Sequence, residues 1–163
     1  MWWKVVKSGE YLTPPPNSQT MFIGEFQHNL DEKGRLAIPA KFRADLKKGA
    51  VVTKGLDDCL FLYTKAAWEE LVSSKLSQLS FNKANQRAFA RFMLSGASEV
   101  ECDAQGRVVL PEYLRQFASL RKQTVIAGLY DRLEIWDKDR WEAYRSNNDK
   151  TSGSIAESLD DLS

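Results

Sequence analysis

The sequence predicts an α+β fold in which two tandem copies of one β-rich unit close on each other into a pseudo-symmetric, barrel-like core with flanking helices. The first observation is a repeat, because residues 31–39 (DEKGRLAIP) recur as residues 103–111 (DAQGRVVLP). The second is that short apolar runs alternate with turns that contain Gly and Asp, which is typical of short strands. A unit of about 45 residues is too small to bury both faces of four strands, so two units must share one core.

The repeat extends on both sides of this motif. The matching positions are Gly24 with Gly96, Phe42-Arg43 with Leu114-Arg115, residues 55–63 with residues 128–136, and Trp68-Glu69 with Trp141-Glu142. The second copy contains one extra residue before its 128–136 segment. We therefore interpret the chain as a tandem duplication.

Each copy is predicted to form two strands, a helix, two more strands and a final helix. The first strand ends near Leu30, or near Cys102 in the second copy, at a turn with Asp in its first position and Gly in its fourth. The next strand starts at Arg35 or Arg107, with the arginine on the face opposite the apolar residues. Pro39 and Pro111 suit the first position of the following helix, where the missing amide is no loss.

The remaining elements follow from hydrophobic periodicity. The residues expected on the buried faces of the two short helices are Phe42, Leu46, Leu114 and Phe117. The later strands are expected at 51–52, 60–63, 124–126 and 133–136. Trp68, Leu71, Val72, Leu76 and Leu79 have helical spacing, and a further helix is expected from Asn82 to about Met93.

These patterns predict five regions. They are a disordered N-terminal extension over 1–20, a first unit over 21–69, linking helices over 70–92, a second unit over 93–145 and a flexible, serine-rich tail over 146–163. The extension contains a Pro-rich segment, and we expect Met21 to be the natural start of the protein.

Composition excludes several classes of protein. The net charge is +1, the two cysteines are far apart in the sequence, and His28 is the single histidine. These features disfavour a zinc site, a disulfide framework and a histidine-dependent triad, so we expect no catalytic residue, metal or cofactor. We also expect no membrane segment and no small-molecule substrate, and a cytoplasmic location. Any basic surface must be local, because the whole chain is nearly neutral.

The paired motifs Asp31-x-x-Gly34-Arg35 and Asp103-x-x-Gly106-Arg107, each followed by a proline-led helix, resemble the bacterial MraZ family from Met21 to about Trp141. The resemblance implies two AbrB-like (SpoVT-AbrB) swapped-hairpin units in one chain, assembled as a homo-oligomeric ring of about eight to twelve subunits. It also implies a nucleoid-associated, sequence-specific regulator of transcription, in the role of repressor. Its target is double-stranded promoter DNA of the division and cell-wall gene cluster, which it recognises through short repeated boxes.

The same resemblance implies that Arg35 contacts DNA, with Lys33 beside it, and that Arg107 is its counterpart in the second copy. Position 105 is Gln rather than Lys, so the two copies need not contact DNA equally. We interpret Asp31, Gly34, Asp103 and Gly106 as residues that shape the turns.

Other interpretations stay open at this stage. Each arginine has an aspartate four residues before it, and a structural ion pair is the simplest alternative to DNA contact. An exposed ion pair contributes little to stability, however, whereas a guanidinium on phosphate or guanine gives the arginine a function. The chain could instead be a protein-interaction or assembly module that does not bind DNA. An enzyme would need convergent carboxylates, and Glu25, Glu99 and Glu101 have no visible partner in the sequence.

Overall fold

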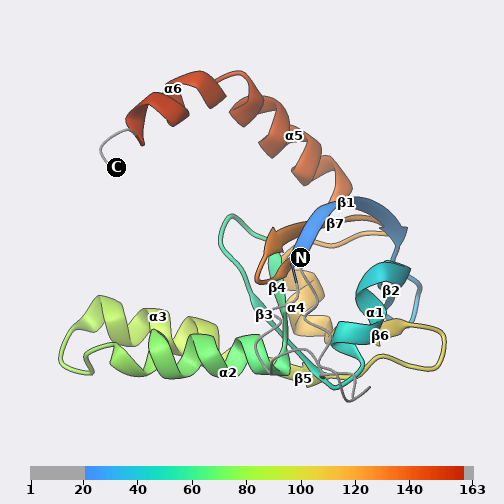
Figure 1. The fold of residues 1–163 in the computed structure, drawn as a ribbon, viewed down its shortest axis with the longest axis horizontal. Helices are drawn as coiled ribbons and strands as arrows, with labels where there is room; N and C mark the ends of the chain where they lie inside the picture. Colours follow the sequence, from blue (N-terminus) through green and yellow to red (C-terminus); the bar gives the residue numbers. More distant parts are fainter. Residues whose placement is uncertain (1–20, 160–163) are drawn as a thin grey trace, which may run out of the picture.

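The computed structural model describes residues 21–159, so the predicted disordered extension over 1–20 lies outside the described residues. The first repeat contains β1 (Phe22–Asn29), β2 (Arg35–Ala37), α1 (Ala40–Leu46), β3 (Ala50–Lys54), β4 (Leu60–Thr64) and α2 (Lys65–Ser74). A short 3-10 helix, η1 (Leu76–Gln78), and α3 (Ala84–Ser95) follow (Figure 1). The second repeat contains β5 (Ser98–Val100), β6 (Arg107–Val109), α4 (Glu112–Phe117), β7 (Gln123–Tyr130), β8 (Leu133–Asp137) and α5 (Lys138–Asp149), and α6 (Ser152–Ser158) comes last. The predicted order of elements within each repeat is therefore confirmed.

All strand pairs are antiparallel, and the two repeats exchange strands. A six-stranded sheet has the order β1-β7-β8-β4-β3-β5, and β2 pairs with β6 in a separate two-stranded ribbon. β1 pairs with β7 of the second repeat, and β5 pairs with β3 of the first. The mixed α+β class is as predicted, but the prediction of a barrel-like core is wrong. Within residues 21–159 the sheet stays open between β1 and β5, because β5 ends after three residues and the chain then leaves the sheet for the second turn.

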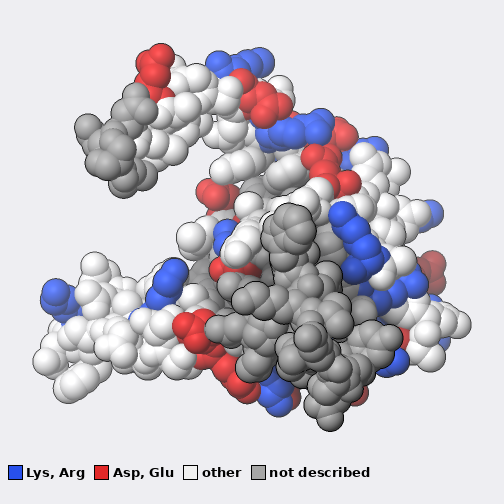
Figure 2. Space-filling view, viewed as in Figure 1, with Lys and Arg blue, Asp and Glu red and all other residues white. Residues whose placement is uncertain are grey.

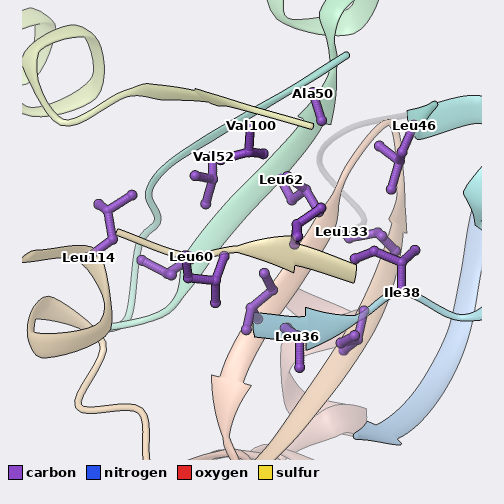
Figure 3. Close-up of a cluster of buried hydrophobic side chains, with 14 of the residues drawn as sticks. Leu36, Ile38, Leu46, Ala50, Val52, Leu60, Leu62, Val100, Leu114 and Leu133 are labelled. Carbon is purple, nitrogen blue, oxygen red and sulfur yellow. The ribbon is translucent and has the colours of Figure 1, made fainter. Parts of the chain in front are cut away.

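The main core lies between the sheet, the β2–β6 ribbon, α1 and α4. Figure 3 shows apolar side chains from these elements converging, among them Leu36 and Ile38 from the β2 segment, Leu46 from α1 and Leu114 from α4. Leu36 and Val108 pair with each other at the middle of the ribbon, and both are fully buried. Their neighbours Arg35 and Arg107 therefore face away from the core, because successive side chains of a strand point to opposite faces.

The other face of the sheet is covered by the helices that link the repeats. Phe61 and Tyr63 of β4 pack there with Leu76 and Met93, while Leu60 and Leu62 of the same strand belong to the main core. Thr64 caps the start of α2, and its side-chain oxygen accepts a hydrogen bond from the Ala67 amide at 3.1 Å. Residues of both helices, among them Leu71 of α2 and Met93 of α3, pack in the same apolar cluster, and beyond it α2 and α3 extend away from the sheet (Figure 1).

Two local expectations differ from the structure. Pro39 and Pro111 precede α1 and α4 rather than occupying their first helical positions, and their ψ angles of 133° and 144° are extended. Residues 146–159 of the tail, for which no helix was predicted, contain the end of α5 and all of α6. α5 is anchored by Trp141 and Tyr144, whose rings lie 5.4 and 5.0 Å from that of Trp136. α6 is exposed along its length, and Figure 1 shows it at the end of an arm that leaves the body of the molecule.

No helix among residues 21–159 is long and apolar enough to cross a membrane.

Candidate nucleic-acid interface

The two motif turns have the same backbone geometry. In the first turn the Gly34 amide donates to the Asp31 carbonyl at 3.0 Å, and in the second the Gly106 amide donates to the Asp103 carbonyl at 3.0 Å. The φ angles of the two glycines are +77° and +76°. Residues with a side chain rarely adopt this conformation, which explains the glycine in the fourth position of both turns.

Each aspartate holds its turn closed through its carboxylate. Asp31 Oδ1 accepts hydrogen bonds from the amides of Lys33 (3.0 Å) and Arg35 (2.8 Å). Asp103 Oδ1 accepts from the amides of Gln105 and Arg107, both at 2.9 Å. The Arg35 amide, assisted by the Arg35 side chain, lowers the pKa of Asp31, and the Arg107 amide does the same for the pKa of Asp103. Both aspartates are therefore ionised at neutral pH.

Each arginine is also bound to the aspartate of its own turn. Arg35 Nε donates to Asp31 Oδ2 at 2.5 Å, and Arg107 Nε donates to Asp103 Oδ2 at 2.9 Å. The ion pair considered as an alternative to DNA contact is thus present in both turns. Among the described residues, only Nε of each guanidinium makes a hydrogen bond, so the two terminal nitrogens of each arginine keep their donors for a ligand.

The β2–β6 ribbon brings the two arginines onto one face. Arg35 lies opposite Val109, and Arg107 lies opposite Ala37, so the arginines are diagonal neighbours on the outward face. The pairing continues beyond the strands, because the Leu110 amide donates to the Gly34 carbonyl at 2.8 Å and the Ile38 amide to the Gly106 carbonyl at 2.9 Å. The result is a short, two-stranded ribbon with a basic turn at each end.

Two further arginines, known from the sequence only as matching positions of the repeat, contact the turns across the repeat boundary. Arg43 Nε donates to the Ile38 carbonyl at 2.8 Å and lies against Gly106 of the second turn. Arg115 Nε donates to the Leu110 carbonyl at 3.0 Å and lies against Gly34 of the first turn. One sequence signal could have found them, because each stands four residues after the proline of its copy.

The ribbon is a local basic surface on a nearly neutral chain. The first end has the cations Lys33, Arg35 and Arg115 against the carboxylates of Asp31 and Glu32, and the second end has two arginines against Asp103. Each end therefore carries one net positive charge. In Figure 2 basic side chains gather on the right, where Figure 1 places α1, β2 and β6. A surface of this sign and shape suits a polyanion.

Comparison with known proteins identifies the family. Residues 21–92 and 93–161 each match the family model described as "MraZ protein, putative antitoxin-like". The chain belongs to the MraZ family. The two matches also confirm the tandem duplication, since each covers one copy of the repeat.

The MraZ relatives match nearly over their full length. The chain is 50% identical over 142 residues to the "Transcriptional regulator MraZ" of Desulforamulus reducens, which covers 87% of this chain and 99% of the relative. The protein of the same name from Pediococcus pentosaceus is also 50% identical, and that from Syntrophomonas wolfei is 48% identical, each with the same coverage. This MraZ chain is thus a transcriptional regulator and not an enzyme.

Proposed function

We propose that this MraZ chain is a sequence-specific DNA-binding repressor of the division and cell-wall gene cluster. In this proposal two AbrB-like units form the β2–β6 ribbon, and Arg35, Lys33 and Arg107 contact promoter DNA. The observation that carries the proposal is the pair of arginines on the outward face of one ribbon, each fixed by an identical turn. The function that the relatives' name gives them, regulation of transcription, supports it as well.

The shape of the ribbon suits the major groove of DNA. That groove is about 12 Å wide and admits a two-stranded β-ribbon as readily as an α-helix. Guanine presents two acceptors there, O6 and N7, which match the two terminal nitrogens of an arginine. Arg35 and Arg107 each have those nitrogens free of hydrogen bonds to residues 21–159, and Lys33 at the tip of the first turn can reach a phosphate.

One subunit offers only two weakly charged turns, so strong binding needs several subunits. We propose a ring of about eight to twelve copies, located in the cytoplasm at the nucleoid, that engages several short boxes at once. Binding of a second box is then intramolecular, and overall affinity can exceed that for one box by about 10² to 10⁴.

The test is binding of the purified chain to a fluorescent duplex from upstream of its own gene, with a scrambled duplex as competitor and a titration of salt. We expect binding to weaken as salt rises, because cations on the protein release counterions from DNA. Arg35→Ala combined with Arg107→Ala should remove the sequence preference. Arg91→Ala is the matched control, since it removes one exposed arginine of α3, on the other side of the molecule from the ribbon (Figure 1).

Two outcomes would overturn the proposal. If the assembled wild-type chain prefers its own upstream duplex no more than the scrambled one, it does not read DNA sequence. If it assembles but binds neither duplex, it is a protein-interaction or assembly module instead.

A further inference from the structure

We propose that each subunit docks on its DNA box in one fixed orientation, set by four outward side chains of the ribbon. Lys33 and Val109 mark its first end, and Gln105 and Ala37 mark its second end. This inference rests on the proposed DNA-binding function and adds to it a determinant of specificity.

The backbone of the ribbon does not distinguish the two ends. Ala37 pairs with Arg107 as Val109 pairs with Arg35, and the two amide-to-carbonyl bonds at the ends, 2.8 and 2.9 Å, have nearly the same length. The bond from the glycine amide to the aspartate carbonyl is 3.0 Å long in both turns. A ribbon with identical side chains at both ends would therefore present the same surface after a half-turn rotation, and would bind a box equally well in either direction.

The arginines preserve this symmetry, because Arg35 and Arg107 occupy equivalent positions and bind their aspartates in the same way. Arg43 and Arg115 preserve it too, since each lies over the turn of the other repeat. These four arginines account for attraction to DNA, but they give it no direction.

The two ends differ at the turn tip, where Glu32-Lys33 of the first turn corresponds to Ala104-Gln105 of the second, and at the ribbon position nearest to the tip. Lys33 and Gln105 are equivalent exposed tip residues with different chemistry. Lysine is a compact charge with donors only, which suits a phosphate or guanine. Glutamine offers a donor and an acceptor together, which matches N6 and N7 of adenine.

The second difference is apolar. Val109 lies beside the first turn and is 55% exposed, whereas the equivalent position at the second end is the small residue Ala37, half-buried. A branched apolar side chain on the outward face can contact the methyl group of thymine, and alanine reaches less far. Both differences distinguish the same two ends, so a reversed subunit would misread at least two positions of the box. We expect the correct orientation to be favoured about tenfold or more.

The experiment maps orientation by local DNA cleavage. An iron–EDTA reagent is attached to one introduced cysteine, placed by Glu32→Cys at the first turn or by Ala104→Cys at the second, in the full chain with Cys102→Ser. Cys59 is fully buried and stays unlabelled. The probe is the duplex from upstream of the gene. We expect the reagent at position 32 to cut at one end of each protected box and the reagent at position 104 to cut at the other.

Two variants then test the four side chains. In chains that also lack Glu32, through Glu32→Cys or Glu32→Ala, Lys33→Gln with Val109→Ala makes the ends alike, and each reagent should now cut at both ends of a box. Adding Gln105→Lys and Ala37→Val to these two exchanges the ends, and the two cleavage patterns should trade places. If the fourfold variant does not fold, Lys33→Gln with Gln105→Lys, which alters exposed tips alone, should weaken or reverse the pattern.

Cleavage at both ends by the wild-type chain, with normal binding, would overturn the inference and leave DNA binding intact. An exchanged variant that keeps the wild-type pattern would show that orientation is set elsewhere. A wild-type chain that does not bind the upstream duplex would overturn the proposed function itself, and the inference with it.

Discussion

Gly106→Ala should destabilise the chain through an arginine of the other repeat. The φ angle of Gly106 is +76°, and a residue with a Cβ pays roughly 1–2 kcal/mol in that conformation. The added Cβ would also overlap the side chain of Arg43. Displacing Arg43 breaks its 2.8 Å hydrogen bond to the Ile38 carbonyl, which lowers the free energy of unfolding by a further amount of about 0.5–1.5 kcal/mol. The expected total is therefore about 1.5–3.5 kcal/mol.

A double-mutant cycle separates the two contributions. With Arg43→Ala already present, Gly106→Ala should cost only the backbone strain, so the two changes should be coupled by about 0.5–1.5 kcal/mol. Arg115→Ala is the matched control, because Arg115 lies over Gly34 and not over Gly106. The assay is urea unfolding at one fixed protein concentration, since assembly would add to the apparent stability. Equal coupling of Gly106→Ala to Arg43→Ala and to Arg115→Ala would refute the contact across the repeats.

Three further predictions concern DNA binding and pH. Arg35→Ala should lower affinity for the upstream duplex at least tenfold, while the melting temperature and assembly stay close to wild type. Arg35→Lys should restore little of that affinity, because lysine lacks the planar guanidinium, and wild-type affinity in either variant would contradict a DNA contact by Arg35. Two boxes about 10 base pairs apart should bind more tightly than one box, and a five-base-pair insertion between them should abolish the gain, so equal affinity for all three duplexes would exclude multivalent reading. Because folding lowers the pKa of Asp31 and Asp103, the two carboxylates stabilise the folded chain fully at pH values above their unfolded-state pKa, and this stabilisation is lost as pH falls through their folded-state pKa. In urea unfolding below about pH 4, the free energy of unfolding should therefore change less with pH in Asp31→Asn with Asp103→Asn than in wild type.

Local chemistry made much of the fold predictable. A turn that starts with Asp and reaches Gly in its fourth position has few other conformations, and the burial of Leu36 between two outward residues follows from the period of a strand. Having two copies made the prediction stronger, because each element had to fit both sequences. Phe42 and Leu114 are buried as the periodicity indicated.

Long-range pairing was harder to predict. Whether β1 meets β5 to close a barrel depends on strand lengths, and the equivalent strands differ, with eight residues in β1 and three in β5. The contacts of Arg43 and Arg115 join segments far apart in the chain, so their shared spacing from Pro39 and Pro111 indicates the two residues but not their partners. α6 was missed for another reason, since its composition is polar and its apolar residue Ile155 is 43% exposed.

The aspartate beside each arginine affects whether such a ribbon would bind DNA through its base sequence or through its backbone charge. Asp31 holds the Arg35 guanidinium in one geometry through Nε, so less rotamer entropy is lost when the terminal nitrogens meet a base. The same carboxylate offsets much of the attraction of Arg35 for a phosphate, because opposite charges lie side by side. A hydrogen-bond acceptor on a base in the groove is recognised mainly by geometry, so the carboxylate weakens that contact less than it weakens a phosphate contact. An ion pair in the turn and a DNA contact by the same arginine are therefore compatible, and together they favour base reading over non-specific binding.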